Sequence, residues 1–278
     1  MNISQLAINS VSTAGDTLEE RLAAYEAAGF RKVEFMLGHV KDYFKQGHTL
    51  LDARHLLAAH QLQCIGGFEI GLEAFSDPEQ RAQNHTQIIE NARLLAQLGG
   101  INLVVGTDGP PSGVEDPLGQ LAATFAEVGS QIEDTGVSLC IEFNWSPLVK
   151  SLRAAVEVAR RSGRKNVGVL FDPAHYHCTP SKFDQLDDEA ISYIKHVHVD
   201  DMNDKPGELS NCNSDRALPG EGCLDLRALF GRIEEGGYRG YFSIEMFSET
   251  LWAMPAAQAA HLMYQSLLPL TADAPQKT

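Results

Sequence analysis

Short apolar segments alternate along the whole chain with longer segments in which apolar side chains recur at helical spacing. The apolar segments predict strands that start near Leu6, Lys32, Gln63, Ile101, Val137, Val167, Ile194 and Gly240. The longer segments predict helices over residues 17–28, 52–60, 78–98, 116–134, 149–161, 224–235 and 254–268. The pattern therefore predicts repeated strand–helix units from one end of the chain to the other.

Repeated units of this kind form either an open doubly wound sheet or a closed eight-stranded barrel. An open sheet usually carries a glycine-rich phosphate loop after its first strand, but here that strand runs into Ser10-Val11-Ser12-Thr13. A chain of 278 residues also fits the size of one TIM barrel, about 250 residues. The sequence predicts a single (β/α)8 TIM barrel of the α/β class over residues 1–270, followed by a C-terminal tail over residues 271–278.

The charge of the chain limits its partners. The formal net charge is −15, from 22 Lys and Arg against 37 Asp and Glu, and phosphate binding needs clustered cations. This charge argues against a nucleic-acid or anionic-membrane surface. The sequence has no apolar stretch long enough to span a membrane, and its first residues lead us to expect no secretory signal peptide. The five cysteines form no CxxC pair. We therefore expect a cytoplasmic protein with free thiols that acts on a small molecule.

Four consecutive predicted strands, the fifth to the eighth, each end on a side chain that can bind a metal ion. These side chains are Glu142, Asp172, His198 and Glu245. A buried carboxylate or imidazole is costly unless it has a partner. The C-terminal ends of barrel strands meet at one mouth, so the four endings indicate one shared site. Three carboxylates and one imidazole suit a divalent ion such as Mn²⁺, Co²⁺, Zn²⁺ or Mg²⁺.

Further polar residues lie close to these strand ends. His196 shares a strand face with His198 and is interpreted as a core or supporting residue. Asp201 is interpreted as a residue that orients a ligand or lies near the metal. Glu34 and Glu69, on the second and third predicted strands, could touch substrate, but structural or surface roles are favoured for both.

The second half of the chain carries five motifs: Ile141-Glu142, the DxxH of Asp172 to His175, the HxxD of His198 to Asp201, the Arg216…Pro219-Gly220-Glu221-Gly222 loop with Asp225, and Ile244-Glu245. Together they resemble the xylose-isomerase-like TIM-barrel superfamily of sugar-phosphate isomerases and epimerases. That superfamily includes ketose 3-epimerases, inosose isomerases and dehydratases, 3-dehydroshikimate dehydratases and endonuclease IV. The motifs are specific for the superfamily but separate its members poorly.

The resemblance implies roles for individual residues. It implies that one divalent ion, with Mn²⁺ as the first expectation, is bound by Glu142, Asp172, His198 and Glu245. It implies that His175 and Arg216 contact substrate oxygens. It also implies that Glu142 and Glu245 transfer a proton on opposite faces of the substrate. Enzymes of this kind are often dimers or tetramers, so the resemblance also allows a homo-oligomer.

These observations favour a metal-dependent isomerase or epimerase of a ketose, an inosose or a sugar phosphate. It would abstract a proton next to a carbonyl group and form a metal-stabilised enediolate. The alternative is a dehydratase of a keto-cyclitol or a 3-dehydroshikimate-like substrate, with His175 as the acid for the leaving hydroxyl. An endonuclease-IV-like enzyme is disfavoured because it needs a multi-zinc cluster and a basic DNA face. A further alternative is a non-catalytic sugar-binding barrel, which would bind a metal ion but convert no keto-sugar.

Overall fold

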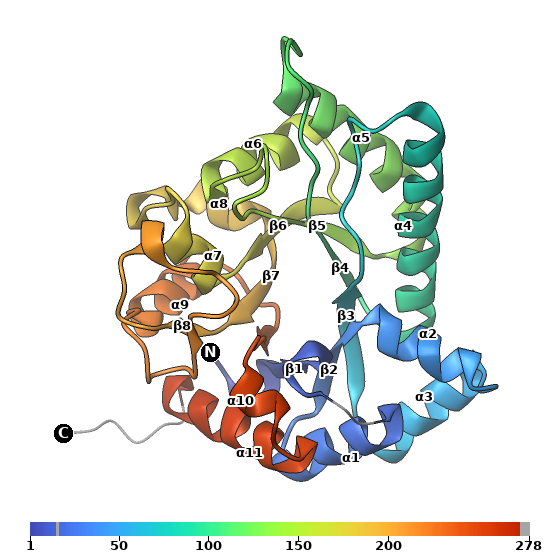
Figure 1. Ribbon diagram of the computed structural model, residues 1–278, viewed down its shortest axis with the longest axis vertical. Helices are drawn as coiled ribbons and strands as arrows, with labels where there is room; N and C mark the ends of the chain where they lie inside the picture. Colours follow the sequence, from blue (N-terminus) through green and yellow to red (C-terminus); the bar gives the residue numbers. More distant parts are fainter. Residues whose placement is uncertain (15–16, 273–278) are drawn as a thin grey trace.

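The structure, a computed structural model, describes residues 1–14 and 17–272. Eight parallel strands close into a barrel in the order β1-β10-β7-β6-β5-β4-β3-β2, and Figure 1 shows the helices as an outer ring around them. The predicted (β/α)8 barrel is confirmed. The barrel strands are β1 (Leu6–Asn9), β2 (Lys32–Met36), β3 (Gln63–Phe68), β4 (Asn102–Val105), β5 (Ser138–Glu142), β6 (Val167–Phe171), β7 (Ile194–Val199) and β10 (Phe242–Ile244).

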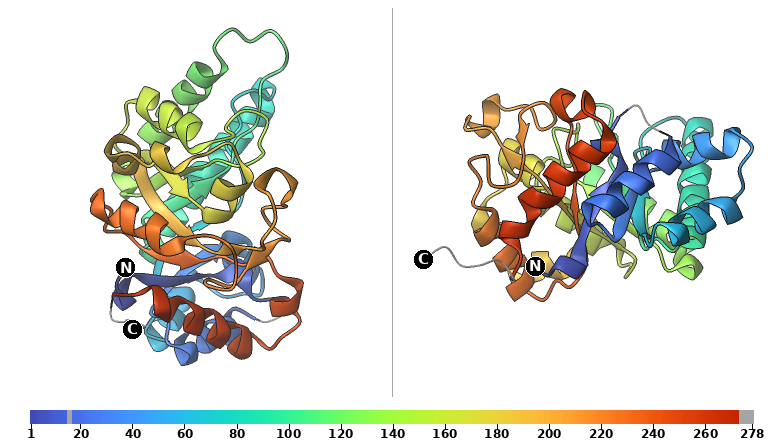
Figure 2. Two further views of the ribbon diagram at one scale, coloured as in Figure 1. Left: turned by 90° about the vertical axis from the view of Figure 1, so that its left-hand side faces the viewer. Right: turned by 90° about the horizontal axis from the view of Figure 1, so that it is seen from below.

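The seven helices predicted from apolar spacing are present; α4 has the predicted bounds, and the others differ from prediction at one or both ends. They are α1 (Leu18–Ala28), α3 (Leu50–Ala59), α4 (Pro78–Leu98), α5 (Pro117–Gln131), α6 (Leu152–Ser162), α9 (Leu226–Glu235) and α11 (Ala256–Leu267). Four shorter helices were not predicted: α2 (Leu37–Lys45), α7 (Pro173–Cys178), α8 (Asp188–Tyr193) and α10 (Glu249–Trp252). Figure 2 shows α11 beside α1, so the last long helix closes the ring against the first.

Apolar side chains make up most of the barrel wall, and the buried polar side chains on its strands include Glu34, Asn102 and His196. Parallel strands covered by helices are buried on both faces, which explains their continuous apolar runs. A small apolar cluster lies apart from the main core and consists of Val104, Cys140 and Leu170, with Phe68 packed against it. Cys140 is fully buried, as expected for a core residue. Phe68 and Val104 also line the pocket described below, so this cluster supports the wall of the candidate site.

The N-terminus and Ala272 are in contact. The N–H of Ala272 donates to the Met1 carbonyl oxygen at 2.8 Å, and residues 273–278 of the predicted tail lie outside the described residues. Within the described ranges, every helix is too short or too polar for a bilayer crossing. The cytoplasmic location stays a prediction.

A small hairpin follows β7 at the C-terminal end of the barrel. β8 (Asp201–Met202) pairs antiparallel with β9 (Arg216–Ala217), and Met202 lies opposite Arg216 in the register. Residues 203–215 form the connection between the two strands. The hairpin brings Arg216, which is distant from β7 along the chain, back to the strand ends.

Asp201 fixes the loop after this hairpin. Its Oδ1 accepts from the backbone N–H groups of Met202 and Leu224 at 2.9 and 3.0 Å. Its Oδ2 accepts from those of Gly220 and Gly222 at 3.0 and 3.1 Å. A Cβ on Gly222 would lie 2.3 Å from Oδ1, so this close approach requires glycine. The contacts of Asp201 are those of a structural residue, and the interpretation that it orients a ligand is not supported.

We expect Asp201→Asn to lower the free energy of unfolding by about 2–3 kcal/mol, because one side of the amide would face N–H donors with its own N–H₂ group. Urea unfolding measures the change. Asp204, an exposed residue in the connection between β8 and β9, provides the control. Asp204→Asn should change the free energy of unfolding by less than about 0.5 kcal/mol. Equal stability of the two variants would contradict the structural role of Asp201.

Candidate functional site

All four predicted metal-binding side chains lie at the C-terminal end of the barrel. Glu142 is the last residue of β5, and His198 is next to last in β7. Asp172 and Glu245 directly follow β6 and β10. These four strands are consecutive in the closed barrel, so their side chains start from adjacent positions around one mouth.

Three of the four side chains converge on one point. His198 Nδ1 lies 3.2 Å from Asp172 Oδ2 and 3.3 Å from Glu245 Oε2. One ligand atom from each of the three residues lies within 4.8 Å of the others, and all three residues are buried. The second oxygen of Asp172 accepts from the backbone N–H of His175 at 3.0 Å as the N-cap of α7. This cap fixes the carboxylate and leaves Oδ2 directed at His198.

Glu142 lies beside this group rather than in it. Its Oε1 is 3.3 Å from His175 Nε2, and its Oε2 accepts from Asn144 Nδ2 at 3.1 Å. Among the described residues, the groups of clustered ligand atoms do not include Glu142. His175 Nε2 is also 3.9 Å from Asp172 Oδ2, so the imidazole bridges Glu142 and the converging group.

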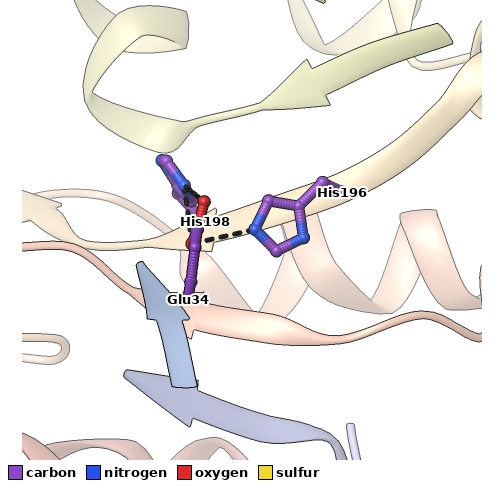
Figure 3. Close-up of side chains that lie close together, drawn as sticks. All are labelled: Glu34, His196 and His198. Atoms are coloured by element: carbon purple, nitrogen blue, oxygen red, sulfur yellow. Dashed lines mark hydrogen bonds and ion pairs between the residues drawn. The ribbon is translucent and has the colours of Figure 1, made fainter. Parts of the chain in front are cut away.

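Glu34, in the middle of β2, lies at the site, although the sequence favoured a structural or surface role for it. Its side chain is fully buried, and its Oε2 lies 3.0 Å from His196 Nε2 and 3.2 Å from His198 Nε2. Figure 3 shows both imidazoles directed at the Glu34 carboxylate. A His198 ring that donates its Nε2–H to Glu34 presents the lone pair of Nδ1 on its other side. The supporting role expected for His196 agrees with its contact with Glu34.

Arg216 contacts the carboxylates of the site rather than the open pocket. Its side chain is fully buried, and its Nη1 lies 2.6 Å from Asp200 Oδ2 and 3.1 Å from Glu245 Oε2. Its Nη2 donates to Asp172 Oδ2 at 3.1 Å. Asp200, a residue that sequence reasoning missed, directly follows β7 and is fully buried. Because Arg216 is not among the residues that line the pocket, the expected substrate contact has no support in this geometry.

The charges around the site shift the ionisation of its members. Burial disfavours the charged form of Asp172, but the positive charge of Arg216 helps to outweigh burial and holds the pKa of that carboxyl well below its usual range. Burial also disfavours a protonated His198, but the carboxylates of Glu245 and Glu34 raise the pKa of that ring well above its usual value. The point where these groups meet therefore favours a positive charge.

A pocket of about 290 Å³ opens at the strand ends. Its polar lining includes Glu142, Glu245, His175 and Asn144. Its remaining lining residues are Phe68, Glu69, Ile70, Gly71, Val104, Gly106, Cys212, Asn213 and Phe247. The mixture of apolar and polar groups suits a small polyhydroxylated molecule, which has C–H faces and hydroxyl edges.

The donor set fits a divalent cation. The acidic residues around His198 are Glu34, Glu142, Asp172, Asp200 and Glu245, and the permanent cation among them is Arg216. Buried carboxylates in such excess need a further positive charge, either protons or a metal ion. Carboxylate oxygens and an imidazole nitrogen are ligands that Mn²⁺ and Zn²⁺ accept.

Comparison with known proteins agrees with the barrel fold. The sequence matches the family described as xylose isomerase-like TIM barrel over residues 22–266. Inosose isomerase of Bacillus velezensis is 25% identical over 270 residues, which cover 91% of this chain and 92% of that protein. 3-Dehydroshikimate dehydratase of Pseudomonas aeruginosa is 30% identical over 277 residues, which cover 95% of this chain but 41% of that protein.

A solved structure gives the same result for the fold. The crystal structure of the IolI protein with a zinc atom is similar to this chain with a TM-score of 0.86 and 22% identity, covering 98% of this chain and 100% of that one. The named relatives are enzymes, one an isomerase and one a dehydratase. Since the family match spans most of the chain, this protein belongs to the xylose isomerase-like TIM barrel family.

Proposed function

We propose that this protein is a divalent-metal-dependent isomerase or epimerase of an uncharged ketose or inosose. The observation that carries the proposal is the convergence of ligand atoms from Asp172, His198 and Glu245 beside a pocket lined by Glu142 and His175. The similarity to inosose isomerase supports the choice of substrate class.

The lining of the pocket favours a substrate without phosphate or carboxylate groups. It contains three glutamates, Glu69, Glu142 and Glu245, and neither lysine nor arginine among the described residues. A phosphate or carboxylate group is usually bound by such cations. The apolar rings of Phe68 and Phe247 offer surfaces for the C–H faces of a sugar or cyclitol ring.

The metal ion would be held by Asp172, His198 and Glu245, with Glu142 as the fourth ligand. Mn²⁺ is our first choice, and Co²⁺, Mg²⁺ and Zn²⁺ are alternatives that the same ligands accept. When bound, such an ion supplies Lewis-acid stabilisation of the negative charge that develops on the substrate carbonyl oxygen.

The protein's own carboxylates would move the proton. Glu142 and Glu245 start from β5 and β10 and line the same pocket, so one can take the proton next to the carbonyl group and the other can return a proton. Asn144 and His175 hold the Glu142 carboxylate at 3.1 and 3.3 Å, which limits its movement. The buried Arg216 would keep Glu245 and its neighbours in place.

A dehydratase is the second candidate. His175 Nε2 lies 3.3 Å from Glu142 and lines the pocket, so it is placed to donate a proton to a leaving hydroxyl after Glu142 has taken one. The similarity to 3-dehydroshikimate dehydratase points the same way. Proton NMR in D₂O separates the two reactions, because an isomerase or epimerase incorporates deuterium without loss of water, whereas a dehydratase gives an enone.

We expect Glu142→Gln to lower kcat by at least about a hundredfold on any ketose or inosose that the wild type converts, because an amide cannot accept the proton. The fold should be retained. Deuterium incorporation measures the rate. Glu127→Gln, an exposed change of the same charge on α5, should keep full activity. Full activity of Glu142→Gln would place the proton transfer elsewhere.

A further inference from the structure

Glu69 directly follows β3 and lines the candidate pocket away from the metal-binding residues. In the closed order of the barrel, β3 lies opposite β7, the strand that carries His198. A substrate in the pocket therefore has the converging group on one side and Glu69 on the other. The proposed proton transfer does not use Glu69.

Three donors hold this carboxylate by one of its two oxygens. Glu69 Oε2 accepts from Lys41 Nζ at 2.5 Å, Asn91 Nδ2 at 3.0 Å and Gln87 Nε2 at 3.1 Å. Lys41 comes from α2, and Asn91 and Gln87 come from α4. Lys41 Nζ also donates to Asn91 Oδ1 at 2.8 Å, so the donors hold one another in place. An arrangement of this kind fixes the carboxylate far more firmly than a single surface ion pair does.

The other oxygen remains available. Within the described residues, the hydrogen bonds of the Glu69 carboxylate all end on Oε2, and its side chain is 20% exposed. Asn91, which is 1% exposed in the middle of α4, uses both its amide oxygen and its amide nitrogen for this cluster. Asn91 is therefore fixed between Lys41 and the Glu69 carboxylate, which holds Oε2 in one position.

We propose that Glu69 recognises a hydroxyl group of an uncharged polyhydroxy substrate by accepting a hydrogen bond at Oε1, on the pocket wall opposite His198. The inference rests on the proposed function, since it assumes that the pocket takes such a substrate. A fixed carboxylate selects hydroxyl donors and repels phosphate and carboxylate groups. Glu69 therefore determines specificity and does not take part in proton transfer.

The variant Glu69→Gln tests this role without a change in volume. Lys41, Asn91 and Gln87 are all donors toward Glu69, so they hold the amide oxygen and turn the N–H₂ group toward the pocket. The pocket then gains a donor in place of an acceptor. Glu90→Gln, an exposed change of the same charge on α4, is the matched control.

Calorimetry on the metal-loaded protein would use inositol as an unreactive polyol, together with inositol monophosphate. We expect the Kd of inositol to rise at least about tenfold in Glu69→Gln, the loss of one hydrogen bond to a charged group, and to stay unchanged in Glu90→Gln. We expect the wild type to bind the monophosphate more weakly than inositol, and Glu69→Gln to reduce that difference.

Two results would overturn the inference. One is a wild type that binds no inositol. The other is a Glu69→Gln variant with a lower Tm but an unchanged Kd, which is the result of a purely structural contact between α2, α4 and β3. Failure of the proposed function has a different signature, because the protein would then bind inositol through Glu69 and yet convert no ketose or inosose.

Discussion

Replacing His198 with alanine is expected to reduce the divalent metal content from about one ion per chain to a small fraction and to lower kcat/KM by about a thousandfold or more. His198 contributes the nitrogen on which Asp172 and Glu245 converge, at 3.2 and 3.3 Å. Its loss removes one of three clustered ligand atoms and the link to Glu34. Elemental analysis after dialysis measures the metal content, and deuterium exchange into a ketose or inosose measures the rate.

His196 provides the control for this variant. It is as buried as His198, projects from the same strand and contacts the same Glu34 carboxylate, so His196→Ala leaves a similar cavity. Its ring contacts neither Asp172 nor Glu245. We expect His196→Ala to keep its metal when the ion is in excess, with affinity lower by about 10–100-fold because Glu34 loses a partner. Equal metal content in both variants would show that the ion binds elsewhere.

The barrel could be predicted because every strand is under the same physical requirement, namely burial against helices. Parallel strands covered by helices are largely apolar on both faces, so the strand signal occurs eight times, and the covering helices give a second signal that occurs seven times. The helices that escaped prediction are short, and α7 shows why. Asp172-Pro173 is typical of a turn as well as of a helix start, and six residues are too few to show helical spacing.

The strand-end residues could be predicted for a related reason. A barrel brings the C-terminal ends of its strands together, so Asp172, His198 and Glu245 needed only their positions in the sequence to be placed at one mouth. Glu34 could not be placed in this way. It lies in the interior of a strand, and its partner His198 is 164 residues away along the chain. A charged residue inside an apolar strand is the signal, because such a group needs a buried partner.

The role of Arg216 could not be predicted because a sequence does not show where a long side chain points. A loop arginine near the pocket can reach either the substrate or the carboxylates behind it. In the structure, the β8–β9 hairpin brings Arg216 back to the strand ends, where its guanidinium group contacts Asp172 and Glu245. Its Nε donates to the Cys212 carbonyl oxygen at 2.8 Å and its Nη1 to the Glu245 carbonyl oxygen at 2.8 Å, which fixes the plane of the guanidinium group.

We expect Arg216→Met to lower the free energy of unfolding by about 3–5 kcal/mol, because it leaves buried carboxylates without their cation. The affected side chains are Asp172, Asp200 and Glu245. Urea unfolding of the metal-free protein measures the change. Arg160→Met is the control, since Arg160 and Glu157 form an exposed pair at 2.8 Å, whose loss should cost less than about 1 kcal/mol.

The milder variant Arg216→Lys distinguishes two roles for Arg216. One is to hold the carboxylates in place, and the other is the substrate contact that the resemblance implies. Lysine keeps the charge but cannot reach Asp172 and Asp200 with a planar fork, so a residue that holds carboxylates should lose stability and metal affinity on this change. A residue that contacts substrate should instead raise the KM while stability and metal affinity stay at the wild-type level. Because the guanidinium group is fully buried behind Asp172 and Glu245, we expect the first result.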